Sequence, residues 1–447
     1  MSDTLTFLET LKARDSQRGP EPSWIAARRQ AGAARFEAVG FPTRRDEEWK
    51  YTNVRDIARG NFSLTDSSEF SPASAAALTL PVEAHRLTFV DGVYAPALSD
   101  LQGLPDGVQV LPLSQALEDN HEAVGGPLGR LTGVEFSAFT ALNTAFMEEG
   151  AVIRLADGCV VEKPILLQFL SRENEAPTMC HPRVLVEAGG RSEATVIEHH
   201  TGDAGAKNFT NLVAELFLGR GAIFTHYKLQ EAPLGDYHVA SIHVEQARDS
   251  RYVSHNMDLG GALVRNDLIS DLNGKGAEAT FNGLFFGQGR QHVDNHTKVN
   301  HYAPLTFSNE NYKGVLDDRA HGVFNGRVYV HRDSQQIEGF QSNQNLLLSD
   351  RAHIDAKPEL EIYADDVKCS HGTTTGQLDE DAIFALRTRG LDEQTARGLL
   401  TLAFAGEVLE EVALDAIAQR VELTVAGKLP DRFNLVGLVE ASTALND

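Results

Sequence analysis

The central part of the chain alternates apolar and polar residues over short stretches. Clear examples lie at 183–187, 194–198, 281–286 and 360–362. A period of two residues is what a β-strand with one buried face requires. The region from about residue 85 to residue 375 is therefore predicted to consist mainly of strands.

A short turn motif, a charged residue followed by a small one, recurs between these strands. Successive copies are 29, 29, 26, 44 and 32 residues apart, at 191–192, 220–221, 249–250, 275–276, 319–320 and 351–352. A nearly constant period of this length indicates a solenoid, and a repeat made only of strands indicates a β-helix. The alternative is a β-sandwich, in which turns recur every 8–12 residues or so. The longer period favours the solenoid.

Both ends of the chain have helical patterns instead. Apolar residues recur at helical spacing over 24–39, where Gly40 and Pro42 end the pattern, and 63–77 is predicted to be a loop. Near the C-terminus, one helix is expected to end at Gly390, a second to begin after Asp392, and a third to begin at about residue 407. These patterns predict an N-terminal helical domain with a linker (1–84), a β-helix core (85–375) and a C-terminal helical domain (376–447).

Charge and length exclude several classes of protein. The 447 residues include 63 acidic and 40 basic side chains, which gives a net charge of −23. Nucleic acids and anionic membrane surfaces both require a basic face, so neither is an expected partner. No apolar run is long enough to span a bilayer, and the first residues lack the pattern of a secretory signal. Three cysteines form no disulfide framework, so a cytoplasmic protein is expected.

Standard catalytic signatures are missing from the sequence. It contains no phosphate-loop motif, no G-x-S-x-G motif and no C-x-x-C pair. Two acidic pairs, Asp317-Asp318 and Asp365-Asp366, could act as catalytic carboxylates, as in β-helical enzymes that act on polysaccharides. Acidic pairs at solenoid turns are more often simply solvated.

The histidines give weak signals individually. His292 and His296 have the spacing of a helical zinc pair, but their surroundings predict a strand, in which they would lie about 13 Å apart. The remaining histidine groups are interpreted as strand-surface or stacked ladder residues: His181, His199, His200, His226, His238 and His243.

One tetrapeptide combines two strong ligand types. Cys369 and His371 are two residues apart, so in an extended chain the thiol and the imidazole lie on the same side. If the strand register continues from 359–363, both face outward. Thiolate and imidazole suit iron, iron–sulfur clusters and zinc, but two ligands are too few for a cluster. Any metal centre here must therefore be completed by another chain, by sulfide or by a transient donor. The alternative is a packed cysteine and a capping histidine at the end of the solenoid.

The residues around this tetrapeptide resemble a known family. The stretch 365–372, together with Thr374, 376–379 and 384–390, is similar to the C-terminal signature of the SufB/SufD family, the scaffold subunits of SUF iron–sulfur cluster assembly. Segments 40–45, 48–52, 291–297 and 357–360 resemble further family motifs, so the resemblance runs from about residue 40 to about residue 430. Gly372 after the histidine, and the lack of any cysteine between 181 and 368, favour the SufD branch over the SufB branch. Thr373 and Ala385 depart from the usual pattern.

This resemblance implies a fold, partners and site residues. It implies a right-handed parallel β-helix between two helical domains, in a complex with a SufB-like paralogue and the ATPase SufC. His371 corresponds to a histidine that contributes to a transient cluster at the SufB–SufD interface, and Cys369 to a neighbouring position. No cofactor is expected to be stably bound by the chain alone, and a flavin on the complex is compatible with the family. The expected contacts for the SufC-like ATPase are Phe384, Leu386, Arg387, Arg389 and Gly390.

Three functions follow as hypotheses. The first is a non-catalytic scaffold for iron–sulfur cluster assembly. The second is a β-helical enzyme that acts on polysaccharides, against which the presence of only 2 tryptophans counts. The third is a self-associating structural solenoid, since exposed edge strands can pair across chains to give a homodimer.

Overall fold

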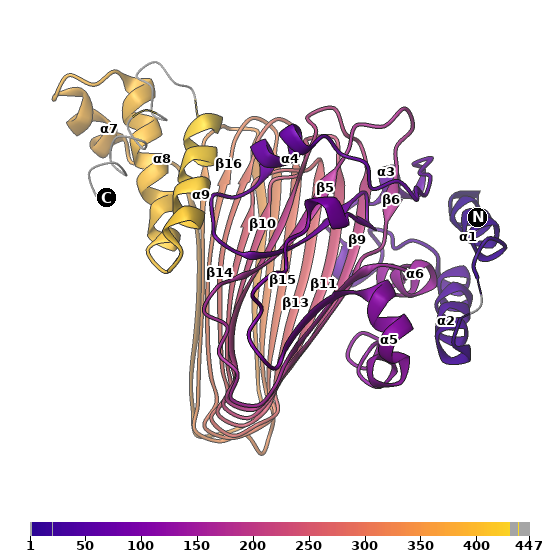
Figure 1. Ribbon diagram of the computed structural model, residues 1–447. Helices are drawn as coiled ribbons and strands as arrows, with labels where there is room; N and C mark the ends of the chain where they lie inside the picture. Colours follow the sequence, from indigo (N-terminus) through magenta and orange to yellow (C-terminus); the bar gives the residue numbers. More distant parts are fainter. Residues whose placement is uncertain (1, 20, 430–436, 438–447) are drawn as a thin grey trace.

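Two parallel β-sheets face each other through most of the molecule. The structure is a computed structural model that describes residues 2–19, 21–429 and 437. From β7 onward, consecutive strands alternate between the two sheets, so the chain winds as a flattened β-solenoid (Figure 1). In spatial order, the first sheet contains β2 (Val93–Tyr94), β1 (His85–Val90), β5 (Ile165–Ser171), β8 (Glu193–Gly202), β10 (Ile223–Gln230), β12 (Arg251–Asp258), β14 (Glu278–Gly287), β16 (Phe307–Leu316), β18 (Ile337–Leu347) and β20 (Val367–Gly376).

The second sheet lies opposite and supplies the other strand of each coil. Its spatial order is β19 (His353–Ile362), β17 (His321–Val330), β15 (His292–His301), β13 (Leu263–Leu272), β11 (Tyr237–Gln246), β9 (Phe209–Leu218), β7 (Arg183–Ala188), β4 (Gly150–Leu155) and β3 (Val108–Pro112), with the short β6 (Met179–Cys180) paired to β9. The predicted strands at 183–187, 194–198, 281–286 and 360–362 all lie within these elements, which confirms the mainly β solenoid.

The turns explain the repeat seen in the sequence. First-sheet strands from β8 onward begin at residues 193, 223, 251, 278, 307, 337 and 367, so one coil takes 27–30 residues. At each of four successive turns from the second sheet to the first, one residue has φ between 56° and 73°. These residues are Arg191, Gly221, Asp249 and Gly276. Leu305 and Gln336 occupy the same place, both with φ of 60°, but lack the charged–small pattern. The motifs at 319–320 and 351–352 lie at the opposite end of the strands, which accounts for the spacing of 44 residues.

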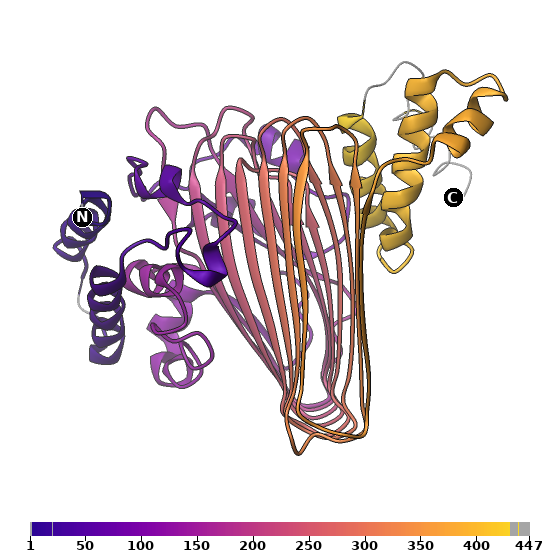
Figure 2. The same cartoon turned by 180° about the vertical axis from the view of Figure 1, so that it is seen from behind.

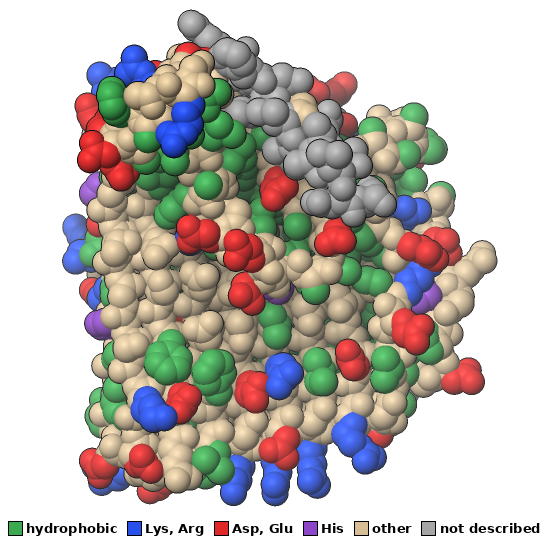
Figure 3. Space-filling view, turned by 90° about the vertical axis from the view of Figure 1, so that its left-hand side faces the viewer, with side chains coloured by type: hydrophobic (Ala, Val, Ile, Leu, Met, Phe, Trp, Pro, Cys, Tyr) green, Lys and Arg blue, Asp and Glu red, His purple; other side chains and the backbone are tan. Residues whose placement is uncertain are grey.

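These turns stack at one end of the solenoid. They form the narrow lower end in Figure 2, and Lys and Arg side chains line this lower edge in Figure 3. The sequence places a basic residue at successive turns there: Arg191, Arg220, Arg248 and Lys275. These charged side chains are exposed to solvent, and the apolar core is formed by the strands.

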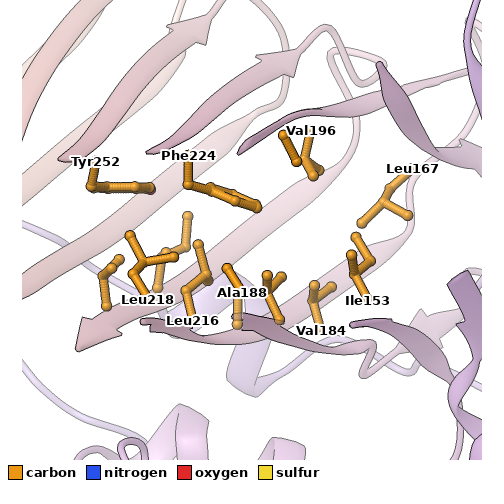
Figure 4. Close-up of a cluster of buried hydrophobic side chains, with 14 of the residues drawn as sticks. Ile153, Leu167, Val184, Ala188, Val196, Leu216, Leu218, Phe224 and Tyr252 are labelled. Carbon is orange, nitrogen blue, oxygen red and sulfur yellow. The ribbon is translucent and has the colours of Figure 1, made fainter. Parts of the chain in front are cut away.

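Apolar side chains from both sheets fill the space between them. Figure 4 shows Leu167, Val196 and Phe224 of the first sheet facing Val184 and Leu216 of the second. All five are at most 3% exposed. Residues two apart on a strand point the same way, so the alternating pattern places one set inside.

The two ends of the solenoid differ. At the N-terminal end β2 pairs antiparallel with β1, and β3 pairs antiparallel with β4, so both sheets end in a reversed strand. At the other end the outermost strands are β20 in the first sheet and β19 in the second. Within the described residues each of these has a hydrogen-bonded neighbour on one side only. This end therefore presents two open strand edges.

The N-terminal helices cover the outer face of the second sheet. They are α1 (Ser2–Asp15), α2 (Ser23–Val39) and α3 (Arg55–Ala58), joined there by α5 (Leu113–Gly125) and α6 (Ala138–Phe146). A Cβ at Gly32 of α2 would lie 2.7 Å from the carbonyl oxygen of Ala141, so this close approach of α2 to α6 requires glycine.

The C-terminal helices cover the outer face of the first sheet. They are α7 (Glu380–Arg387), α8 (Glu393–Leu409) and α9 (Asp415–Lys428). The amide of Ala413 donates to the Tyr227 hydroxyl at 3.2 Å, and Arg420 pairs with Glu231 at 3.0 Å. The Asp392 side chain accepts from the amide of Gln394, as a helix N-cap should. No helix among the described residues is long and apolar enough to cross a bilayer.

Several helices differ from the sequence prediction. Helix α1 was not predicted, α4 (Pro72–Leu78) lies largely within the loop predicted at 63–77, and α5 and α6 interrupt the region expected to be strands. Helix α8 continues to Leu409, so the third C-terminal helix begins at Asp415 rather than at about 407. The start of the third helix was placed too early because Val408 and Leu409, at the end of α8, continue the helical spacing of the apolar residues in α9.

Candidate functional site

Cys369 and His371 lie on β20, the last strand of the first sheet. Cys369 is opposite Gly339 of β18 and packs with Val328 and Leu360 in the interior of the last coil. Cys369 therefore does not share the outward side of Glu359, so the condition on which the outward placement depended, a continuous strand register, is not met. The turn between β19 and β20 breaks the strand register, so side-chain parity does not carry across it. Burial raises the pKa of the Cys369 thiol, and a backbone hydrogen bond from Gly339 partly opposes this effect.

His371 ends a column of polar side chains that runs into the solenoid. It is opposite Gln341 of β18, which is opposite Glu310 of β16. Gln341 donates to the Glu310 carboxyl at 3.2 Å, and the Thr297 hydroxyl donates to the same oxygen at 2.5 Å. Burial raises the pKa of Glu310 to about 7. His371 itself is exposed because no further coil covers it.

The ligand set around Cys369 is incomplete. Two groups of three His, Cys, Asp or Glu ligand atoms converge among the described residues, and neither contains Cys369 or His371. Iron–sulfur clusters usually take four protein ligands. A metal centre at this edge would therefore need ligands from outside the described chain, and the open strand edge is where another chain could supply them.

Helix α7 follows β20 and presents a second exposed feature. Phe384 is 66% exposed, more than any other large apolar side chain of the described residues. Arg387 pairs with Glu393 at 3.4 Å, and Arg389 donates to the carbonyl of Ala385 at 2.7 Å. Gly390, with φ of 96°, ends this segment. The structure brings these predicted contact residues together, with Leu386 turned inward against the C-terminal helices.

Two distant sequence motifs meet on the outer face of the second sheet. The guanidinium of Arg265 lies over the indole ring of Trp49, and one of its terminal nitrogens donates to Asp294 at 2.6 Å while the other donates to Asp267 at 2.8 Å. The Thr52 hydroxyl lies 2.7 Å from the His292 ring. The segments 48–52 and 291–297 are therefore one structural unit.

This contact borders a cavity of about 510 Å³. Burial alone would lower the pKa of His296, but Asp294 and Glu48 raise it above its ordinary value. The hydrogen bond from His296 is the main cause that lowers the pKa of Glu48 to about 2. Lys357 of β19 reaches Glu47 at 3.3 Å. Opposite charges thus hold the N-terminal segment onto the sheet.

The spacing argument for His292 and His296 is confirmed, and part of the wider interpretation of the histidines is corrected. Both residues lie on β15 with different partners, since His292 contacts Thr52 and His296 contacts Asp294 at 3.0 Å. His181, His199, His200, His226 and His238 are buried rather than on the strand surface. His200 and His226 flank Glu198 inside the solenoid, and His243 bonds to Asp271 at 2.8 Å.

Sequence reasoning missed the partners of the site residues. Gln341 and Glu310 follow His371 into the core at intervals of one coil, and Arg265 precedes Asp294 by 29 residues. Once the coil length is known, a search for polar residues that recur at that period would find them.

Comparison with known proteins gives consistent matches over the chain. A family model described as "SUF system FeS cluster assembly, SufBD core domain" matches residues 169–404, and one described as "SufBD protein N-terminal region" matches 11–167. The chain is 33% identical to an iron–sulfur cluster assembly SufBD family protein of Synechocystis, over 94% of each chain. It is 33% identical to the iron–sulfur cluster assembly protein SufD of Escherichia coli, over 88% of this chain and 90% of that one. It is 24% identical to SufD of Bacillus subtilis, over 93% of this chain and 96% of that one.

Proposed function

The chain belongs to the SufBD family of iron–sulfur cluster assembly proteins, and from this premise we propose that it is a SufD-type scaffold subunit. It acts in a complex with a SufB-like paralogue and a SufC-like ATPase. A nascent cluster forms transiently at the interface with the paralogue, as cargo rather than as a resident cofactor.

The observation that carries this proposal is the position of His371 on an open strand edge. His371 is exposed on β20, which is hydrogen-bonded only to β18 among the described strands. A second chain with a similar solenoid end can pair with this edge and bring further ligands to His371 and Cys369. In isolation, the same edges allow two copies of this chain to pair.

Energy for the process is proposed to come from the partner ATPase. The sequence has no phosphate loop of its own. Phe384 of α7 offers an exposed apolar anchor. The basic rim beside it is formed by Arg387 and Arg389, close to Gly390. Such a centre and rim are typical of docking surfaces between proteins. A flavin, as a possible cofactor of the complex, is assigned to no residues of this chain.

The polysaccharide enzyme receives less support from the geometry. Asp317-Asp318 follow β16 and Asp365-Asp366 follow β19, so the two pairs lie at opposite ends of strands about ten residues long. That length corresponds to roughly 33 Å, whereas paired glycosidase carboxylates lie within about 10 Å of each other, so a carboxylate of one pair does not act together with a carboxylate of the other. The side chain of Asp318 instead accepts from the amide of Gly289 across a turn.

The test is cluster assembly on a complex that remains intact. The full chain is co-expressed with SufB-like and SufC-like proteins, and subunit stoichiometry, iron and sulfide are measured after anaerobic purification. His371→Ala should retain the stoichiometry and lower iron and sulfide on the complex. His331→Ala, which removes an exposed histidine outside β20, is the matched control.

Two outcomes would contradict the proposal. If His371→Ala retains the full iron and sulfide content, this residue has no role in cluster formation. If the wild-type chain does not bind the SufB-like protein at all and purifies as a homodimer, the structural-solenoid hypothesis is favoured instead.

A further inference from the structure

A second group of metal-ligand side chains lies on the outer face of the second sheet. His321 is on β17, and His353 and Asp355 are on β19. His321 and His353 are register partners, and residues 353 and 355 point the same way because they are two apart on one strand. The neighbouring residue Ile354 packs in the interior, so the three side chains face outward.

The ligand atoms of these three side chains converge. One ligand atom from each lies within 4.8 Å of the others. Nε2 of His321 is 2.8 Å, and Nε2 of His353 is 3.4 Å, from the same carboxylate oxygen of Asp355. The two imidazole rings lie side by side, with centroids 5.2 Å apart and planes 38° from parallel. Two ring nitrogens and a carboxylate oxygen thus surround one point.

Neighbouring contacts hold this arrangement and leave it open on one side. His292 continues the histidine row on β15, with its ring 4.7 Å from that of His321, and it is tied to Thr52 of the N-terminal segment. The His353 side chain is 66% exposed, whereas His321 and Asp355 are 28% and 25% exposed. Solvent therefore reaches the group from the side of β19, beside the open strand edge.

We propose that His321, His353 and Asp355 bind a first-row divalent transition metal such as Zn²⁺ or Fe²⁺. Two imidazoles with one carboxylate are a ligand set that such ions favour. His353 and Asp355 come from β19 and His321 comes from the neighbouring strand β17, so all three ligands approach the ion from the same side. The remaining positions are left for water or for a ligand from another chain. A simple hydrogen-bonded trio is the alternative, since both histidines can donate to Asp355 instead.

This site is independent of the cluster-assembly proposal. It lies on the other sheet from Cys369 and His371, and it uses neither residue. Its histidines, His321 and His353, are one coil apart in sequence and His292 lies one coil before them, so the coil repeat assembles the row.

The test is Co²⁺ binding to the full-length, metal-free chain, followed by competition with Zn²⁺. The wild-type chain should develop the visible absorption bands of protein-bound Co²⁺ and lose them when Zn²⁺ is added. His353→Ala and Asp355→Asn should each weaken Co²⁺ binding by at least about tenfold. Loss of a residue that only hydrogen-bonds to a metal ligand already lowers metal affinity by about tenfold or more, and loss of a ligand should cost at least as much. Asp355→Asn keeps the shape of the side chain, so it separates loss of a ligand from loss of folding.

A matched variant controls for the other histidines. His331→Ala removes an exposed imidazole that lies between the rings of Tyr302 and Tyr329, and it should bind Co²⁺ as the wild type does. The proposal is overturned if the wild-type chain shows no such bands. It is also overturned if the His353 and Asp355 variants bind Co²⁺ as tightly as the wild type.

Discussion

Arg265 lies over the ring of Trp49, with 4.2 Å between the guanidinium carbon and the ring centroid. Trp49 is only 7% exposed and belongs to the cluster that joins the N-terminal segment to the solenoid. Trp49→Ala should lower the free energy of unfolding by about 3–5 kcal/mol, as is typical for a large buried aromatic residue. Urea unfolding measures the loss, and limited proteolysis should show faster cleavage within 40–60. Tyr51→Ala is the control on the same segment, because Tyr51 is only partly buried.

Arg183 and Glu215 form an ion pair that is almost completely inaccessible to solvent. Their side chains are 1% and 0% exposed, and they lie 2.8 Å apart. Glu215→Gln leaves the Arg183 charge buried without its counter-ion, so we expect a loss of about 3–5 kcal/mol in the free energy of unfolding. Glu278→Gln breaks the exposed pair with Arg251 and should cost at most about 1 kcal/mol. Equal effects of the two variants would contradict the role assigned to burial.

Glu310 should make the protein less stable as the pH rises. Its pKa is raised by burial to about 7, from an ordinary value of 4.5. The folded state therefore holds a proton that the unfolded state releases between these two values, and this contribution to stability is lost as pH rises from 4.5 to 7. Glu310→Gln should unfold with a free energy about 2–4 kcal/mol higher than the wild type at pH 8, and with little difference at pH 4.5. Denaturant unfolding across this range is the measurement. An unchanged pH dependence in the variant would show that Glu310 ionises normally.

Cys180 should be the least reactive of the three thiols. Burial raises its pKa to about 12, so very little thiolate is present at neutral pH. Iodoacetamide at pH 8 should leave Cys180 unmodified in the native chain and modify it in urea, as measured by peptide mass spectrometry. Cys369, whose pKa burial also raises, lies on the outermost strand of its sheet and should react faster than Cys180. Rapid native labelling of Cys180 would mean that the region around β6 opens readily.

Phe384 should matter for binding to the SufC-like ATPase. Its side chain is 66% exposed on α7 and is the expected apolar anchor of the contact. Phe384→Ala should weaken that interaction by about 2 kcal/mol, roughly thirtyfold in Kd, without changing the thermal stability of the chain. Leu234→Ala removes a side chain of similar exposure, 64%, at a turn of the solenoid and serves as the control. Calorimetric titration with the purified ATPase distinguishes the two.

The repeat and the strands were predictable because they obey a local rule. A strand with one inward face must alternate, so 194–198 and 281–286 could be assigned without tertiary information. Helix α6 was missed because it is short, lies among strands and buries nearly all of its residues, so no polar face marks a helical period. Helix α5 does have a polar face, with Gln115, Glu118 and Asp119 exposed, and it was missed because the whole region was assigned to strands.

The site was predictable only in part. Cys369 and His371 are two residues apart in sequence, so their common strand could be inferred. Their orientation could not, because the turn between β19 and β20 resets which residues face inward. The column from His371 through Gln341 to Glu310 joins residues about 30 positions apart. Such contacts become visible in the sequence only when the length of each coil is known.

The difference between the two ends of the solenoid also bears on how the chain folds and unfolds. Each coil contacts mainly the coils before and after it, so order can spread from one coil to the next. Both ends have edge strands, but β1 and β4, behind the antiparallel strands β2 and β3, are mostly buried, whereas β19 and β20 are half-buried or exposed. Opening should therefore begin at β19 and β20, and amide hydrogen exchange should slow progressively from these strands toward β8. Among the described strands, the one that carries His371 is thus expected to be one of the first two to rearrange.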